Sequence, residues 1–261
     1  MRFSKFRVLT DRLMAIVQGD DRIRALLVCG SHATGTADEF SDLDIGLVIT
    51  DVAYEHVLAR PDELVRAIGE SLLLEDFGNP ANLHVILSDG ADLELIIHRE
   101  GELTLERPYR VLLDKGGVED RARERPPPPS RPADSEQTRQ LVHGFWRDVG
   151  HVITALGRGN ILWAHGQLEE LRSTCIALAR LEAGVEADDE PYWKVDEALP
   201  GDRLAALRAT VAPPEIGSMR DAALALLELY RQLAGAVAAE HGIAYPAELD
   251  RLMSARLRDA R

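Results

Sequence analysis

The sequence predicts an α/β domain with a mixed sheet, followed by an all-α helical-bundle domain. Three observations support this prediction. In residues 1–120, short apolar runs typical of strands alternate with segments of helical period. Residues 121–134 contain four consecutive prolines, which exclude a helix and favour a semi-rigid linker. In residues 135–261 the apolar residues recur only at helical spacing. We therefore expect two domains joined by a proline-rich linker.

The elements of the first domain follow from the pattern of its apolar residues. A helical period is present in residues 4–18 and again in residues 54–74, where Pro61 marks a break or a new start. A short helix is expected to begin after Ser31. The dipeptide Asp89-Gly90 separates two apolar runs and predicts a β-hairpin. The expected strands comprise residues 22–29, 44–50, 83–88, 93–98 and 109–114.

The second domain shows only helical periodicity, interrupted by turn signals. Pro200-Gly201 and Pro213-Pro214 punctuate the helical segments. The apolar stripe that includes Leu224 and Leu227 is typical of a helix packed against its neighbours. The expected helices comprise residues 135–157, 160–183, 201–211, 215–241 and 246–258.

The composition excludes several classes of protein. The chain has 261 residues, of which 46% are apolar, so a sizeable core is available. The formal net charge of −14 argues against a nucleic-acid partner, which normally requires a basic surface. This charge fits a cationic small-molecule substrate, or simply an acidic soluble protein. We find no signal peptide and no membrane span, and the two cysteines have no metal-ligand spacing. We expect a cytoplasmic monomer.

The motif with the clearest chemical meaning is Gly30-Ser31, followed after ten residues by Asp42-Leu43-Asp44. Successive side chains of a strand point to opposite faces, so Asp42 and Asp44 are expected to share one face. Paired carboxylates offer the oxygen ligands that Mg²⁺ prefers. A turn of small residues lets the backbone approach phosphate oxygens. The motif therefore predicts metal-assisted chemistry on a nucleotide.

A third carboxylate is needed for a two-metal arrangement of the kind that transfers nucleotidyl groups. The second strand of the predicted hairpin offers Asp92 and Glu94, which are two residues apart and so share a face. Glu94 lies inside an apolar run, where a charge is costly without a partner or a metal. Asp92 lies beside the turn, where solvation explains it. We therefore prefer Glu94, as a metal ligand, as the general base, or as both.

Neighbouring interpretations of these residues carry less weight. An isolated Asp-x-Asp is common, and Asp42 and Asp44 could simply form a turn that enters a strand. The Gly30-Ser31 turn at this spacing, between two predicted strands, favours the functional interpretation. The chain contains neither a P-loop motif nor the Gly-x-Ser-x-Gly elbow of serine hydrolases.

At these residues the chain resembles the nucleotidyltransferase superfamily, whose members combine a Gly-Ser turn with Asp-x-Asp. The hairpin at residues 89–96 resembles that of the aminoglycoside 6-adenylyltransferases, the streptomycin-modifying type. Those proteins usually have aspartate at the position of Glu94, so this residue is a departure from their pattern. Further similarities lie at Val111–Lys115, Phe145-Trp146, Gly159–Ala164 and Ala244–Pro246.

This resemblance implies that AMP is transferred from Mg·ATP to a hydroxyl group of a small molecule, most plainly an aminoglycoside such as streptomycin, with release of pyrophosphate. It implies two Mg²⁺ ions held by Asp42, Asp44 and Glu94, which are also the catalytic residues. Gly30, Ser31 and Ser41 would contact the nucleotide. In relatives a lysine of the helical domain contacts the triphosphate, and Lys194 is the best match here. The helical domain would bind the acceptor.

Two alternatives remain open from the sequence. A protein-AMPylating nucleotidyltransferase of the antitoxin type shares the Gly-Ser and Asp-x-Asp motif, but its minimal forms usually lack an attached domain of this size. A nucleotide-binding sensor without catalytic activity is also compatible with the motif, although an intact set of three carboxylates argues against it.

Overall fold

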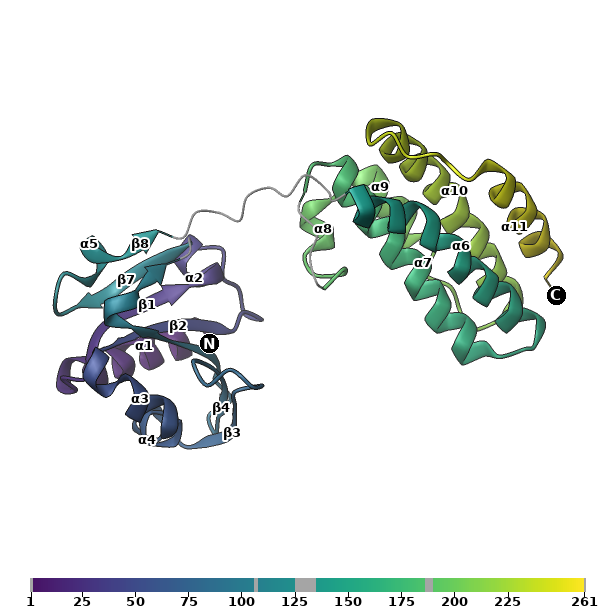
Figure 1. The fold of residues 1–261 in the computed structure, drawn as a ribbon. Coiled ribbons are helices and arrows are strands. Elements are labelled where there is room, and N and C mark those ends of the chain that lie inside the picture. Colours follow the sequence, from purple (N-terminus) through teal and green to yellow (C-terminus); the bar gives the residue numbers. More distant parts are fainter. Residues whose placement is uncertain (1, 106–107, 125–134, 186–189, 261) are drawn as a thin grey trace. The chain divides into compact units, whose positions relative to one another are not determined.

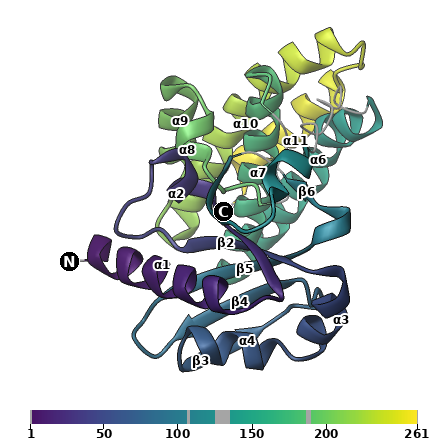
Figure 2. The same ribbon diagram turned by 90° about the vertical axis from the view of Figure 1, so that its left-hand side faces the viewer.

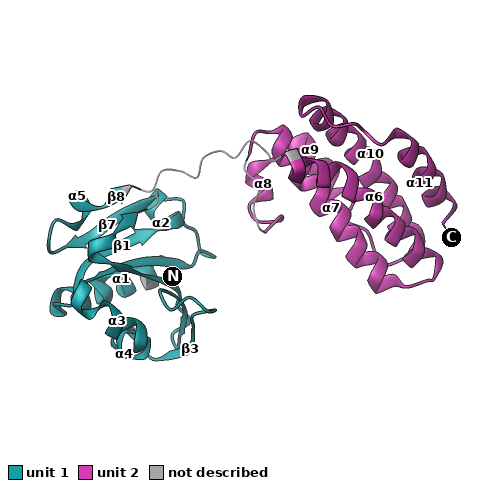
Figure 3. Cartoon of the chain, in the orientation of Figure 1, with its two compact units in different colours: residues 1–127 teal, residues 128–261 magenta. Residues whose placement is uncertain are grey.

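The computed structural model describes residues 2–105, 108–124, 135–185 and 190–260, which form two compact units. Unit 1 comprises residues 1–127 and unit 2 comprises residues 128–261 (Figures 1 and 3). Most of the predicted linker, residues 125–134, lies outside the described residues.

Unit 1 is built on a six-stranded sheet with the order β3-β4-β5-β2-β1-β7. The central strands β2 and β5 run parallel, and the other neighbours are antiparallel. The predicted mixed sheet is therefore confirmed. The strands comprise β1 (Ile23–Cys29), β2 (Leu43–Ile49), β3 (Ser71–Glu75), β4 (Asn82–Leu87), β5 (Asp92–Arg99) and β7 (Tyr109–Asp114).

Helices cover one face of this sheet, where α1, α3 and α4 pack on alternate strand residues to form the main core of the unit (Figure 2). The opposite face carries a smaller apolar cluster that includes Leu27, Val48 and Val118. Burial of these apolar faces stabilises the sheet. The remaining elements of unit 1 are α1 (Arg2–Gly19), α2 (Gly30–Thr34), α3 (Asp51–Ala59), α4 (Pro61–Ile68), the 3₁₀ helix η1 (Glu100–Glu102), α5 (Val118–Arg121) and the short paired strands β6 (Thr104–Leu105) and β8 (Arg123–Glu124).

The expected helical segment 54–74 is wrong at its C-terminal end. Pro61 begins α4, as a residue without a backbone N–H can, and the helix ends before Gly69. Residues 71–75 then form β3, which pairs antiparallel with β4. The short leucine run in this segment fits either a helix or a strand, and pairing with β4 decided the outcome.

Lys115 connects the C-terminal end of α1 to the sheet. Its Nζ donates hydrogen bonds to the carbonyl oxygens of Val17 at 2.6 Å and of Asp20 at 2.7 Å. The last carbonyl groups of a helix have no partner within the helix, and a basic side chain can satisfy them. Lys115 therefore has a structural role in unit 1.

We expect Lys115→Met to lower the free energy of unfolding by about 1.5–3 kcal/mol, the usual range for hydrogen bonds to a charged group. Urea denaturation followed by circular dichroism measures this change. Lys194→Met is the matched control, because exposed Lys194 contacts only the Trp193 ring among its printed interactions and should cost under about 1 kcal/mol. Equal losses in the two variants would contradict the role of Lys115.

Unit 2 is all-helical, as the sequence predicts. Its long helices α6, α7 and α10 pack against one another, and α11 packs on α6 and α10. Only the single-turn helix α8 was not expected from the periodicity. The helices comprise α6 (Ser135–Gly157), α7 (Ile161–Glu182), α8 (Val195–Ala198), α9 (Gly201–Arg208), α10 (Ile216–Glu240) and α11 (Ala247–Asp259).

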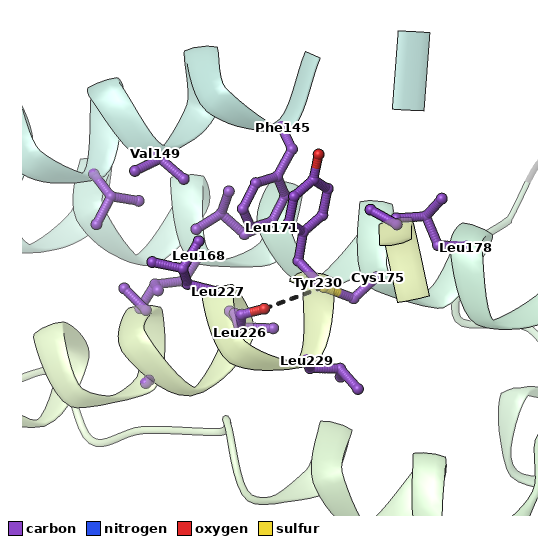
Figure 4. Packing of buried hydrophobic residues seen from close by; sticks show 14 of the residues in the cluster. Phe145, Val149, Leu168, Leu171, Cys175, Leu178, Leu226, Leu227, Leu229 and Tyr230 are labelled. Carbon is purple, nitrogen blue, oxygen red and sulfur yellow. Dashed lines mark hydrogen bonds between the residues drawn. The ribbon is translucent and has the colours of Figure 1, made fainter. Parts of the chain in front are cut away.

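An aromatic stack lies at the centre of this unit (Figure 4). The rings of Phe145 and Tyr230 are parallel, with centroids 3.8 Å apart, and Trp146 meets both rings edge-on. The Tyr230 hydroxyl donates a hydrogen bond to the carbonyl of Val142. Cys175 lies in the same core and donates to the Leu226 carbonyl. The Phe145-Trp146 motif therefore forms part of the helical core.

By length and composition, α10 is apolar enough to cross a membrane, contrary to the sequence-based expectation. However, 56% of its most apolar window is buried inside unit 2. Its apolar residues include Leu226, Tyr230 and Leu233, which belong to the core of this unit. The same composition is typical of a core helix.

Candidate active site

The two halves of the Gly-Ser and Asp-x-Asp motif meet at the junction of β1 and α2. Gly30 begins α2 with φ of +55°, a conformation that favours glycine. A Cβ atom at this position would lie 2.0 Å from Oδ2 of Asp44, far inside any real contact. The carboxylate of Asp44 therefore lies directly against the Gly30 backbone, and only a residue without a side chain fits there.

Asp44 and Glu94 are neighbours on the two central strands. They are register partners in the parallel pair β2–β5, and both are half-buried. Cys29, the last residue of β1, lies near both carboxylates. Burial raises the pKa of the Cys29 thiol to about 11, and the negative charges of Asp44 and Glu94 raise it further in the same direction. The thiol is thus protonated at neutral pH and is not a nucleophile.

Asp42 and Asp92 lie at the same ends of these strands, one residue before the paired positions Leu43 and Leu93. Both aspartates are exposed. Asp42 also lies near His32, whose ring stacks on Phe6. Burial lowers the pKa of His32, although the carboxylate of Asp42 opposes this shift. The structure thus brings the predicted carboxylates Asp42, Asp44 and Glu94 to adjacent strands of one sheet.

The hairpin strand β4 distinguishes Glu94 from Asp92. The amide Nδ2 of Asn82 donates a hydrogen bond to Oε1 of Glu94 at 2.9 Å. His84 hydrogen-bonds to Oδ1 of Asp92 at 2.8 Å, and the Asp92 side chain is 52% exposed. The half-buried, amide-bound Glu94 thus has the more constrained position of the two. This difference favours Glu94 as the third carboxylate.

Asn82 and His84 were not identified from the sequence. They occupy alternate positions of β4, so both side chains lie on one face of the strand, as do Asp92 and Glu94 on β5. The signal that could have found them is this two-residue spacing of polar residues in the hairpin strand. Asn82 carries the more direct consequence, because it contacts a predicted catalytic residue.

Two adjacent cavities open beside these carboxylates, and both include Asp42 and Asp92 in their lining. The smaller has a volume of about 300 Å³ and also contains Glu94 and Phe77. The larger has a volume of about 460 Å³ and contains His32 and Phe40. Cavities of this size accommodate small molecules or parts of them.

The carboxylates suit Mg²⁺ by their chemistry, because they supply only hard oxygen donors from adjacent strands. In the described part of the chain, no three Asp, Glu, His or Cys side chains are gathered closely enough to form a metal cluster. The space beside Asp44 that Gly30 leaves open by lacking a Cβ is the feature that best fits a bound ion and its phosphate ligands. The metal set Asp42, Asp44 and Glu94 remains a prediction.

The predicted nucleotide contacts lie in different surroundings. Ser31 is in the first turn of α2, beside Gly30, and its carbonyl accepts from the N–H groups of Thr36 and Ala37. The Ser41 hydroxyl donates to Oδ1 of Asp38 at 3.1 Å, so it is engaged within its own loop. Lys194 belongs to unit 2, where it precedes α8 with a positive φ of 50°. Contact of these residues with a nucleotide remains a prediction.

The chain is similar to known nucleotidyltransferases. The structure of an aminoglycoside 6-adenyltransferase from Bacillus subtilis shares 18% identity over 97% of both chains, with a TM-score of 0.47. A nucleotidyltransferase-like protein from Exiguobacterium sibiricum shares 11% identity over 90% of this chain and 79% of that chain, with a TM-score of 0.37. The CdnC:HORMA-deltaN complex from E. coli MS115-1 gives 14% identity over 90% of both chains and a TM-score of 0.30.

None of the curated proteins matches the chain. The family described as streptomycin adenylyltransferase matches residues 4–259, which is nearly the whole sequence. A match of this extent covers both units, including the Gly30-Ser31 turn and the carboxylates of β2 and β5. The chain therefore belongs to the streptomycin adenylyltransferase family and is a nucleotidyltransferase.

Proposed function

We propose that the protein transfers AMP from Mg·ATP to a hydroxyl group of an aminoglycoside such as streptomycin and releases pyrophosphate. Family membership supports adenylyl transfer to an aminoglycoside. The observation that supports the site most directly is the contact between the Gly30 backbone and the Asp44 carboxylate, with Glu94 on the adjacent strand. It places a possible phosphate-binding turn beside possible metal ligands.

In this proposal Asp42, Asp44 and Glu94 hold Mg²⁺, and the turn at Gly30 and Ser31 approaches the phosphates. When bound, Mg²⁺ would neutralise phosphate charge and polarise the phosphoryl group. The bond between the acceptor oxygen and the α-phosphorus forms as the bond from that phosphorus to the pyrophosphate oxygen breaks. Glu94 takes the proton of the acceptor hydroxyl, and Asn82 orients Glu94 through the hydrogen bond to Oε1.

The lining of the smaller cavity supports a cationic acceptor. It includes four carboxylates, and no lysine or arginine is among the described residues that line it. The ammonium groups of an aminoglycoside would be favoured beside carboxylates, whereas a triphosphate without metal would be repelled. The four residues are Asp42, Asp76, Asp92 and Glu94.

The test is incubation with Mg·ATP and a panel of aminoglycosides, followed by pyrophosphate release and mass spectrometry of the drug. We expect one adenylyl group to be added to at least one compound. Glu94→Gln should lower kcat by about 100-fold, the lower range for loss of a general base. Asp92→Asn is the matched control and should lower kcat much less.

The outcomes that contradict this proposal are distinct. A larger loss of kcat for Asp92→Asn than for Glu94→Gln would exchange the roles of these two carboxylates. Transfer of label from ATP to a protein in a lysate, with none to any drug, would point to protein AMPylation instead. Tight ATP binding without any transfer would point to a nucleotide sensor.

A further inference from the structure

Phe77 presents an exposed phenyl ring at the smaller cavity. It lies between β3 and β4, and the residue is 80% exposed, which is unusual for so large an apolar side chain. Its φ of +47° is uncommon for any residue other than glycine. Together with Asp42 and Glu94, it lines the cavity of about 300 Å³. The ring is therefore displayed beside the proposed catalytic carboxylates and is not buried in the core.

Hydrogen bonds within the loop hold this conformation. The N–H of Gly78 donates to Oδ1 of Asp76 at 2.8 Å, and the N–H of Asn79 donates to the carbonyl of Asp76 at 2.8 Å. The N–H of Asn82, the first residue of β4, donates to the carbonyl of Asn79 at 2.8 Å. The loop is thus tied to the strand whose Asn82 side chain contacts Glu94.

The ring also has a neighbour on the strand. Its centroid lies 6.2 Å from that of His84, with the two planes inclined by 24°. His84 is itself hydrogen-bonded to Asp92. One side of the phenyl ring therefore lies toward a fixed imidazole, and the rest of its surface is open to a ligand.

The surroundings of the ring favour an organic cation. The face of a phenyl ring carries negative electrostatic potential and attracts ammonium and guanidinium groups. Asp76 and Asp92 line the same cavity and add to this attraction. A guanidinium group is planar and weakly hydrated, so it can stack on the ring and pair with a carboxylate at the same time.

We propose that Phe77 is a specificity-determining residue, whose ring stacks on a guanidinium or ammonium group of the acceptor. The inference rests on the proposed function, because it assigns the smaller cavity to the acceptor of adenylyl transfer. It goes further in naming the group of the acceptor that is recognised and the residue that recognises it.

The test uses three substitutions of Phe77 in the full chain, with streptomycin, which carries guanidinium groups, as the probe. Phe77→Leu retains an apolar side chain without a ring, and Phe77→Ala removes most of the side chain. Both should raise the KM for streptomycin by about three- to thirtyfold, the range expected for loss of a cation–π contact. Phe77→Trp should keep or lower this KM, because indole binds cations best. The KM for ATP should change less than about twofold in all three.

Phe40→Ala is the matched control. Phe40 is also a phenylalanine, is 81% exposed, and lines the larger cavity. Its loss should leave the KM for streptomycin within about twofold. Calorimetric titration of streptomycin into each protein without ATP should give the same order of affinities, and thermal melting confirms that each variant is folded.

The failures of the inference and of the proposed function are distinguishable. If the wild-type protein transfers AMP to streptomycin but Phe77→Leu keeps the wild-type KM, the ring is not used for stacking and the inference is overturned. The same conclusion follows if Phe40→Ala, and not Phe77→Ala, raises this KM. If the wild-type protein neither binds nor modifies any aminoglycoside, the proposed function fails, and the inference fails with it.

Discussion

The Asp44→Asn variant is expected to lose about three orders of magnitude in kcat for adenylyl transfer. Asparagine keeps the shape of the side chain but removes the charge that would hold Mg²⁺ beside the Gly30 backbone. Metal stabilisation of a phosphoryl group contributes several kcal/mol, and about 4 kcal/mol corresponds to a thousandfold in rate. Steady-state kinetics with saturating Mg·ATP and acceptor measures this loss.

The stability of the same variant provides the control. Asp44 is a register partner of Glu94, so the folded protein holds two carboxylates close together. Removing one charge relieves this repulsion, and the free energy of unfolding should therefore stay constant or rise. A variant that loses activity without losing stability indicates a functional carboxylate. A large fall in the melting temperature, with activity retained in the folded fraction, would assign Asp44 a structural role instead.

Gly30→Ala is expected to lower kcat by between about 100- and 1,000-fold and also to destabilise unit 1. The new Cβ would lie 2.0 Å from Oδ2 of Asp44, so the carboxylate or the turn must move by about 1 Å. A displacement of that size in a catalytic group costs about 100-fold in rate. The left-handed backbone of residue 30 adds about 1–2 kcal/mol of strain for any side chain. Kinetics and urea denaturation measure the two effects separately.

Gly35→Ala separates the strain from the collision. Gly35 ends α2 with φ of +76°, and a Cβ there would have no atom within 4 Å. This variant should lose a similar 1–2 kcal/mol of stability and keep kcat within about threefold. If Gly35→Ala loses as much activity as Gly30→Ala, the loss comes from distortion of α2 and not from displacement of Asp44.

The strands that contain the candidate site were predictable because their patterns are local. Apolar runs bounded by turn residues marked β1, β2 and the β4–β5 hairpin, and the structure has these elements within one or two residues of the expected bounds. The long helices of unit 2 were predictable for the same reason. The segment at β3 was mistaken for helix, because its short leucine run carries no decisive period.

The partners of the site residues were not predictable, since they depend on which strands become neighbours. Nothing local in the sequence indicates that β2 pairs with β5, or that Asn82 donates to Glu94 across the hairpin. The exposure of Phe77 is also a product of the folded loop, because its hydrophobic side chain would ordinarily be assigned to a core.

The sequence by itself determined the chemical inventory: a Gly-Ser turn, an Asp-x-Asp strand, a further carboxylate in an apolar run, and a helical domain after a proline-rich segment. These features are encoded in residue types and short spacings, which local propensity and alternation of faces make readable. Only the tertiary structure decided that Asp44 lies against the Gly30 backbone and opposite Glu94. The physical reason is that strand order and register arise from burying both faces of the sheet at once, which no local segment specifies.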